Sequence, residues 1–227
     1  MLFRSPKDTV KYLGFILSPN GLSMDPSKVS TILEWPEPRK VKDIQSFLGF
    51  ANFYRKFISD YSKITVPLTR LMRKGTPWDF SNACQSSFKS LKRAFTTAPV
   101  LARWSPGDPF IVETDASNYA LGAILSTIHP SDNQVHPIAF MSPELNYDVH
   151  NKELLAIFEA FKSWCHYLEG TPTPIDIITD HKNLEYFSTT KVLTQWQARW
   201  SEFLSQFNLV VCFCLRQLGT KLDALIR

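Results

Sequence analysis

The sequence predicts an α/β protein in two parts: a mostly helical first part with a β-hairpin, and a second part built on a mixed β-sheet with flanking helices. In the second part, five short apolar runs rich in β-branched residues alternate with helical periodicity, in the order strand, strand, strand, helix, strand, helix, strand, helix. In the first part, apolar residues recur at helical spacing after one hairpin signal. The pattern changes between Ala98 and Pro109, so we expect domains at residues 1–100 and 101–227.

The first part opens with a hairpin over Val10 to Met24, turning at Pro19-Asn20-Gly21. Asp25 is a good helix N-cap, and Pro26 suits the first helical position, so a helix is expected from there to about Glu34. Apolar residues at helical spacing predict three further helices, over about 44–58, 62–74 and 81–95.

The second part contains five strand-like runs separated by helical segments. The strands are expected at residues 110–116, 120–127, 135–141, 175–179 and 208–215. Helices are expected at 151–168, at 193–207 and from about residue 220. A strand order of this kind is typical of a mixed α/β sheet.

Charge is distributed unevenly along the chain. The formal net charge is +4, but residues 1–100 carry 16 Lys and Arg against 7 Asp and Glu, whereas residues 101–227 carry 9 against 14. A basic part next to an acidic part fits a nucleic-acid-binding surface joined to a metal-binding site. Two ordinary domains of different pI remain the alternative.

Membrane and secretory signals are missing from the sequence pattern. Residues 1–9 contain no apolar signal-peptide core, and no later stretch approaches a membrane span. The four cysteines form no CxxC pair, so we expect reduced thiols and an intracellular, cytoplasmic protein, with a disulfide or metal site as the alternative.

Four acidic residues are the candidates for chemistry: Asp115, Glu153, Asp180 and Asp223. Three of them stand beside short apolar runs, where an unpaired carboxylate is costly to desolvate. Carboxylate oxygens from several elements suit Mg²⁺ or Mn²⁺ rather than zinc. A paired-metal site of this kind cleaves phosphodiesters by in-line attack of an activated water.

Helix geometry separates Glu153 from its neighbour Glu159. Glu153, Ile157, Ala160 and Trp164 fall on one face of the predicted helix, so Glu153 is expected on the apolar side that faces the sheet. Glu159 falls on the solvent side. We interpret Glu153 as a metal ligand, and the alternative is an edge residue whose side chain reaches solvent.

The other candidates have competing structural interpretations. Asp115 lies late in an apolar strand and is either a ligand or a buried, paired carboxylate. Asp180 ends a strand, where ligand sites of α/β sheets gather, but it would also serve as a helix N-cap. Asp223 would by default cap a helix. His181 is either a proton shuttle or, as we favour, a surface or supporting histidine.

The sequence motifs resemble one known family over nearly the whole chain. The strings are YLGFILSPNGLSMDPSKV, WPEPRKVKDIQSFLGFANFYRKFI, PLTRLMRKGTPWDF, IVETDASNYALGAILS, ELNYDVHNKELLAIFEAF, ITDHKNLEYF and QARWSEFLSQFNL. They resemble the reverse transcriptase–ribonuclease H segment of gypsy-type LTR retrotransposon Pol polyproteins. The resemblance implies that residues 1–100 are the end of the polymerase palm and the thumb, and that residues 101–227 are an RNase H-like domain.

The resemblance also implies an activity and its partners. Asp115, Glu153, Asp180 and Asp223 would bind two Mg²⁺ ions, with Mn²⁺ as an alternative, and cleave the RNA strand of an RNA–DNA hybrid. The rest of the polyprotein (polymerase fingers and palm, integrase) and a cytoplasmic virus-like particle with nuclear access are the expected context. Phosphate contacts are expected from basic residues of the thumb, each of which is equally a solvated helix residue: Arg55, Lys56, Lys63, Arg70, Arg73 and Lys74.

Three departures from the family pattern favour an alternative, a catalytically inactive nucleic-acid-binding or decayed remnant. The link from Met141 to Glu144 is shorter than in the family, which would displace Glu153. The tail around Phe213 to Gln217 is altered, and the last helix is expected to be truncated. The polymerase's catalytic aspartates would lie before residue 1, so DNA synthesis is not expected.

Overall fold

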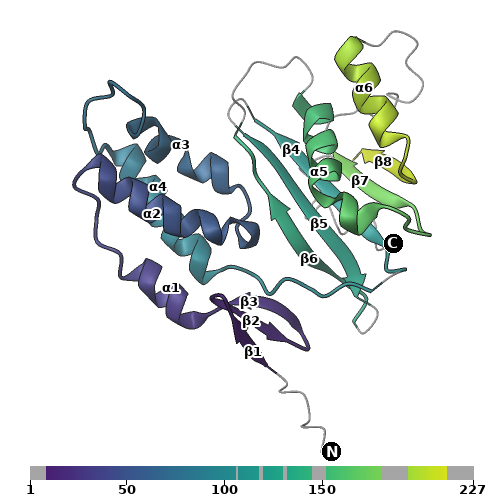
Figure 1. The fold of residues 1–227 in the computed structure, drawn as a ribbon, viewed down its shortest axis with the longest axis horizontal. Helices are drawn as coiled ribbons and strands as arrows, with labels where there is room; N and C mark the ends of the chain where they lie inside the picture. Colours follow the sequence, from purple (N-terminus) through teal and green to yellow (C-terminus); the bar gives the residue numbers. More distant parts are fainter. Residues whose placement is uncertain are drawn as a thin grey trace, which may run out of the picture. The chain divides into compact units, whose positions relative to one another are not determined.

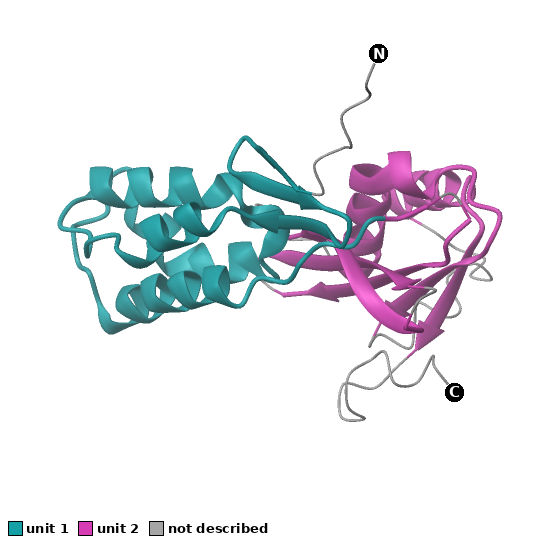
Figure 2. Cartoon of the chain, turned by 90° about the horizontal axis from the view of Figure 1, so that it is seen from below, with its two compact units in different colours: residues 1–103 teal, residues 104–227 magenta. Residues whose placement is uncertain are grey.

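The computed structural model describes residues 9–105, 107–117, 120–129, 132–144, 152–179 and 194–213 of the 227-residue chain. The chain divides into two compact units, residues 1–103 and 104–227 (Figure 2). The division falls within the stretch where the sequence pattern changes. Among the described residues, no helix is both long enough and apolar enough to cross a membrane.

The first unit begins with a three-stranded antiparallel sheet, where the sequence predicted a two-stranded hairpin (Figure 1). Its strands are β1 (Val10–Tyr12), β2 (Phe15–Ser18) and β3 (Gly21–Met24). The predicted turn lies between β2 and β3, but a second turn divides the expected first strand. Leu13 and Gly14 adopt φ angles of 50° and 80° there. Since leucine rarely adopts positive φ, the apolar pattern carried no signal of this turn.

Helices make up the rest of the first unit. They are α1 (Pro26–Leu33), α2 (Val41–Phe53), α3 (Tyr61–Leu71) and α4 (Asn82–Thr96), with a short 3₁₀ helix η1 (Arg55–Phe57) after α2. Asp25 caps α1 as predicted, because its carboxylate accepts a hydrogen bond of 3.0 Å from the Ser27 amide. The helix expected over 44–58 instead ends at Phe53, and its last part is η1. The core lies between α2 and α4, where the rings of Phe47 and Phe88 are 4.5 Å apart.

The second unit contains the predicted five-stranded mixed sheet. Its strands are β4 (Phe110–Ala116), β5 (Leu121–His129), β6 (Gln134–Met141), β7 (Ile175–Thr179) and β8 (Leu209–Phe213), in the order β6-β5-β4-β7-β8. The β4, β5 and β6 strands are antiparallel, whereas β4, β7 and β8 are parallel. The β4 and β7 strands are paired on both edges and most of their residues are buried. The mixed sheet confirms the predicted fold class.

Two helices accompany this sheet, α5 (Lys152–Leu168) and α6 (Gln195–Leu204) (Figure 1). Leu155 and Ala156 of α5 pack with Leu121, and Ala116 lies against the same cluster. The helix expected from about residue 220 lies outside the described residues.

Candidate active site

Asp115 is the next-to-last residue of β4. It is half-buried, and it pairs across the sheet with Gly122 of β5. A glycine opposite the carboxylate leaves space beside it that any other side chain would fill. The small residues Ala116 and Ser117 follow it, as the sequence indicated.

Glu153 lies in the first turn of α5 and is only 7% exposed. The predicted face of the helix is confirmed: Ile157, Ala160 and Trp164 are buried with it. Glu159 lies on the opposite side, where its carboxylate is 3.4 Å from the ammonium of Lys162. The helix therefore buries one carboxylate and holds the other on the solvent side, and the shorter link expected before α5 has not turned Glu153 outward.

The fold brings the elements of these two carboxylates together. Ala116 directly follows Asp115, and Leu155 lies in the same helical turn as Glu153. Ala116 and Leu155 belong to one hydrophobic cluster. The last residues of β4 and the first turn of α5 therefore meet at the carboxyl edge of the parallel strands, where ligand sites of α/β sheets are found.

The remaining predicted residues Asp180, His181 and Asp223 lie outside the described residues. Asp180 directly follows Thr179, the last residue of β7. Over the part of the chain that the structure describes, no three His, Cys, Asp or Glu side chains are placed to hold a metal ion. The assignment of all four carboxylates as one site stays a prediction. The two that are described supply carboxylate oxygens, the donor type that fits Mg²⁺ or Mn²⁺.

Two further acidic residues of the sheet were not singled out from the sequence. Glu113 and Asp176 are half-buried and, from the pairing of β4 with β7, lie on the same face of the sheet as Asp115. Burial raises the pKa of Asp176 above its usual value. Alternation along β4 would have indicated Glu113, but Asp176 depends on the register between β4 and β7, which is not visible in the sequence.

Five of the six candidate basic residues of the first unit are exposed. Arg55, Lys63, Arg70, Arg73 and Lys74 reach solvent on η1, on α3 and just after α3. Lys56 is half-buried, and its ammonium lies 4.1 Å from the centroid of the Phe15 ring. Burial lowers its pKa. We therefore assign Lys56 first to packing of β2 against η1, and the five exposed cations stay candidates for phosphate contacts.

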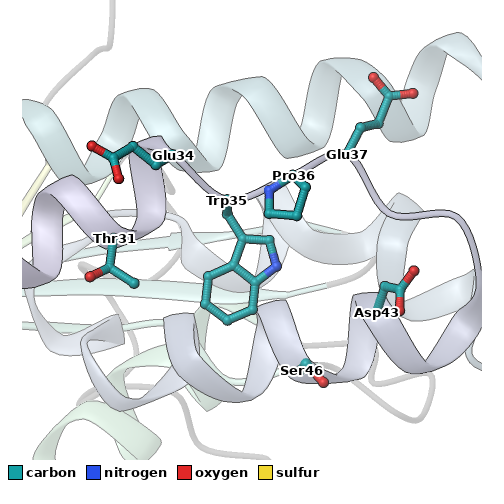
Figure 3. Close-up of a pocket in the computed structure, with 7 residues that line it drawn as sticks. All are labelled: Thr31, Glu34, Trp35, Pro36, Glu37, Asp43 and Ser46. Atoms are coloured by element: carbon teal, nitrogen blue, oxygen red, sulfur yellow. The ribbon is translucent and has the colours of Figure 1, made fainter.

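A groove of about 510 Å³ lies between the end of α1 and the start of α2 in the first unit (Figure 3). Trp35 and Pro36 line it together with three carboxylates, those of Glu34, Glu37 and Asp43. Negative charge on three sides disfavours phosphate groups. The groove is therefore excluded as part of a nucleic-acid interface on this unit.

Sequence comparison relates the chain to reverse transcriptases. The family model of the RNase H-like domain found in reverse transcriptase matches residues 105–207. The transposon Tf2-3 polyprotein of Schizosaccharomyces pombe is 34% identical over 225 residues, which cover 96% of this chain and 17% of the polyprotein. The chain thus spans about a sixth of the length of that relative.

Structure comparison agrees with the fold. A foamy viral protease–reverse transcriptase solved in complex with double-stranded DNA matches with a TM-score of 0.71 and 21% identity, over 91% of this chain and 38% of that one. The foamy viral enzyme solved with an RNA/DNA hybrid matches with a TM-score of 0.70 and 20% identity, over 95% of this chain and 30% of that one.

Proposed function

Because the chain belongs to the LTR-retrotransposon Pol polyproteins and carries the RNase H-like domain of their reverse transcriptase, we propose that its second unit cleaves the RNA strand of RNA–DNA hybrids. One observation carries the proposal. Asp115 and Glu153 come from elements that meet at the carboxyl edge of β4, in the half-buried and buried positions that metal ligands occupy.

RNase H-like domains generally use divalent metal ions. We propose two Mg²⁺ ions, held by Asp115, Glu153, Asp180 and Asp223, and when bound they would supply an activated water and stabilise the leaving oxygen. The protein's own contribution is to fix the positions of its carboxylates. Glu153 is held by the buried face of α5, and Asp115 by its pairing with Gly122 of β5.

The basic first unit would hold the substrate backbone. Five basic side chains are exposed and therefore accessible to phosphates: Arg55, Lys63, Arg70, Arg73 and Lys74. Such contacts neutralise charge and read no sequence. Binding through them is therefore expected to fall steeply with salt concentration.

The test is cleavage of an RNA–DNA hybrid, labelled on each strand in turn, by the purified chain with Mg²⁺ or Mn²⁺. Glu153→Gln keeps the size of the side chain and removes its charge, and we expect it to lower the rate at least about a hundredfold. Glu159→Gln is the matched control, because it changes a carboxylate on the solvent side of the same helix.

Two results would contradict the proposal. One is equal loss of rate in Glu153→Gln and Glu159→Gln, which would remove Glu153 from the site. The other is a folded chain that binds the hybrid and cuts neither strand with either ion. In that case the protein would be a nucleic-acid-binding remnant of a polyprotein.

A further inference from the structure

Trp196 exposes a large aromatic ring on the second unit. It is 63% exposed and lies in the first turn of α6. That turn is fixed by reciprocal hydrogen bonds between Thr194 and Gln197, which form a capping box. Arg199 is also exposed, and its guanidinium carbon lies 5.4 Å from the centroid of the Trp196 ring. An apolar ring and a cation are therefore presented together on a rigid helix end.

The start of α6 lies near the elements that carry the candidate carboxylates. Trp200 of α6 packs against the hydrophobic cluster that contains Leu155 and contacts Ala116. Ala116 directly follows Asp115, and Leu155 shares a helical turn with Glu153. One side of α6 is thus fixed against the end of the unit where the site lies.

The direction of α6 places Trp196 at that same end. Phe158 of α5 contacts Trp200 of α6, and Phe161, further along α5, contacts Phe207, which follows the end of α6. The helices therefore run in the same direction, and the first turn of α6 lies beside the first turn of α5. Side chains of a helix lean toward its N-terminus, so Trp196 projects toward the end at which Glu153 lies.

We propose that Trp196 and Arg199 bind the sugar–phosphate backbone of the hybrid next to the site of cleavage. The inference rests on the proposed function, because the backbone is that of the proposed substrate. The bases of a duplex are stacked on one another, so their faces are not accessible to a protein side chain. An aromatic ring beside the duplex therefore contacts the apolar face of a sugar. The guanidinium suits the adjoining phosphate, with which it forms charge-assisted hydrogen bonds.

A nucleic acid fits this surface better than an apolar protein partner does. The ring stands beside the cation of Arg199, and α6 packs against α5, the helix that carries Glu153. The contact would position the substrate and would not take part in bond cleavage. It predicts weaker binding, without a change of the chemistry, when the ring is removed.

The experiment measures binding of a fluorescein-labelled RNA–DNA hybrid by fluorescence anisotropy at several salt concentrations. The full chain carries Asp115→Asn so that the hybrid stays intact. We expect Trp196→Ala to raise Kd about five- to tenfold with no change in salt dependence, and Trp196→Phe to keep most of the affinity. Arg199→Gln is expected to reduce the slope of log K against log salt by about 0.9, the loss of one phosphate contact. The exposed Glu202, later in the same helix, provides the control Glu202→Gln.

The outcomes separate this inference from the proposed function. If Trp196→Ala binds within twofold of its parent while its circular dichroism is unchanged, the contact is refuted and the nuclease proposal stands. If the chain with Asp115 intact cuts no RNA but Trp196→Ala still weakens binding, the contact stands and the nuclease proposal fails. Absence of hybrid binding by the parent refutes both.

Discussion

Gly21→Ala is expected to destabilise the first unit by about 2–6 kcal/mol. Gly21 begins β3 with a φ of 133°, a region that only glycine occupies readily. A Cβ at this position would overlap the carbonyl oxygen of Leu101. That oxygen accepts a hydrogen bond of 2.8 Å from the Leu22 amide, and the Leu101 amide donates one of 2.8 Å to the Leu22 carbonyl.

The magnitude has two parts. Backbone strain from a side chain at this φ costs ~1–3 kcal/mol. Moving Leu101 away from the new methyl group breaks two backbone hydrogen bonds worth ~0.5–1.5 kcal/mol each. Gly75→Ala measures the backbone strain without the steric overlap, since Gly75 has a φ of 82° but nothing lies within 4 Å of a Cβ built on it. It should cost only the strain, about 1–2 kcal/mol.

The assay is urea unfolding of both variants, combined with hydrogen exchange at the Leu22 and Leu101 amides. Exchange is needed because two units can unfold in separate transitions. We expect both amides to lose protection in Gly21→Ala and to keep it in Gly75→Ala. Equal destabilisation by the two substitutions, or unchanged protection of both amides in Gly21→Ala, would refute the steric reasoning.

Three further predictions follow from the described residues. Phe161→Ala should lower the free energy of unfolding by about 3–5 kcal/mol, because the Phe161 ring is fully buried and its centroid lies 5.1 Å from that of the Phe207 ring. Chemical denaturation measures this change, and a loss below about 1 kcal/mol would contradict the prediction. Burial raises the pKa of Asp176, so the folded state binds the proton of this carboxyl more tightly than the unfolded state, and stability falls as pH rises above 3.8. Asp176→Asn should remove this fall, which is measured as urea midpoints between pH 3 and 7. Parallel curves of midpoint against pH for the two proteins would contradict the prediction. The hydrogen bond from the Ser27 amide is the main cause of the lowered pKa of Asp25, so the contribution of this carboxylate to stability is present at pH 7 and is lost as pH falls through the lowered pKa. Asp25→Ala should therefore reduce the urea midpoint at pH 7 and match the parent protein in strong acid. A difference in midpoint that is independent of pH would contradict the prediction.

Local patterns were sufficient for most elements of the fold. The cap at Asp25 and the buried face of α5 with Glu153 depend on residues within one or two helical turns, and both were predicted. The strands β4 and β7 were predicted with their observed bounds, because each is a short apolar run between turn residues. Periodicity and capping are properties of neighbouring residues, so they can be read without the tertiary structure.

Contacts between distant segments were decided only by the folded chain. Asp176 joins the face of Asp115 through the register of β4 with β7, and Lys56 is withdrawn from solvent by Phe15 of a separate strand. The turn at Leu13 requires a φ that its side chain disfavours, and a hydrogen bond of 3.0 Å from the Asp25 amide to the Gly14 carbonyl joins this turn to a later segment. The sequence by itself determined the elements, the family resemblance and the inward-facing Glu153. The tertiary structure decided which side chains share a face and which cations stay exposed, because these depend on pairing that no local pattern encodes.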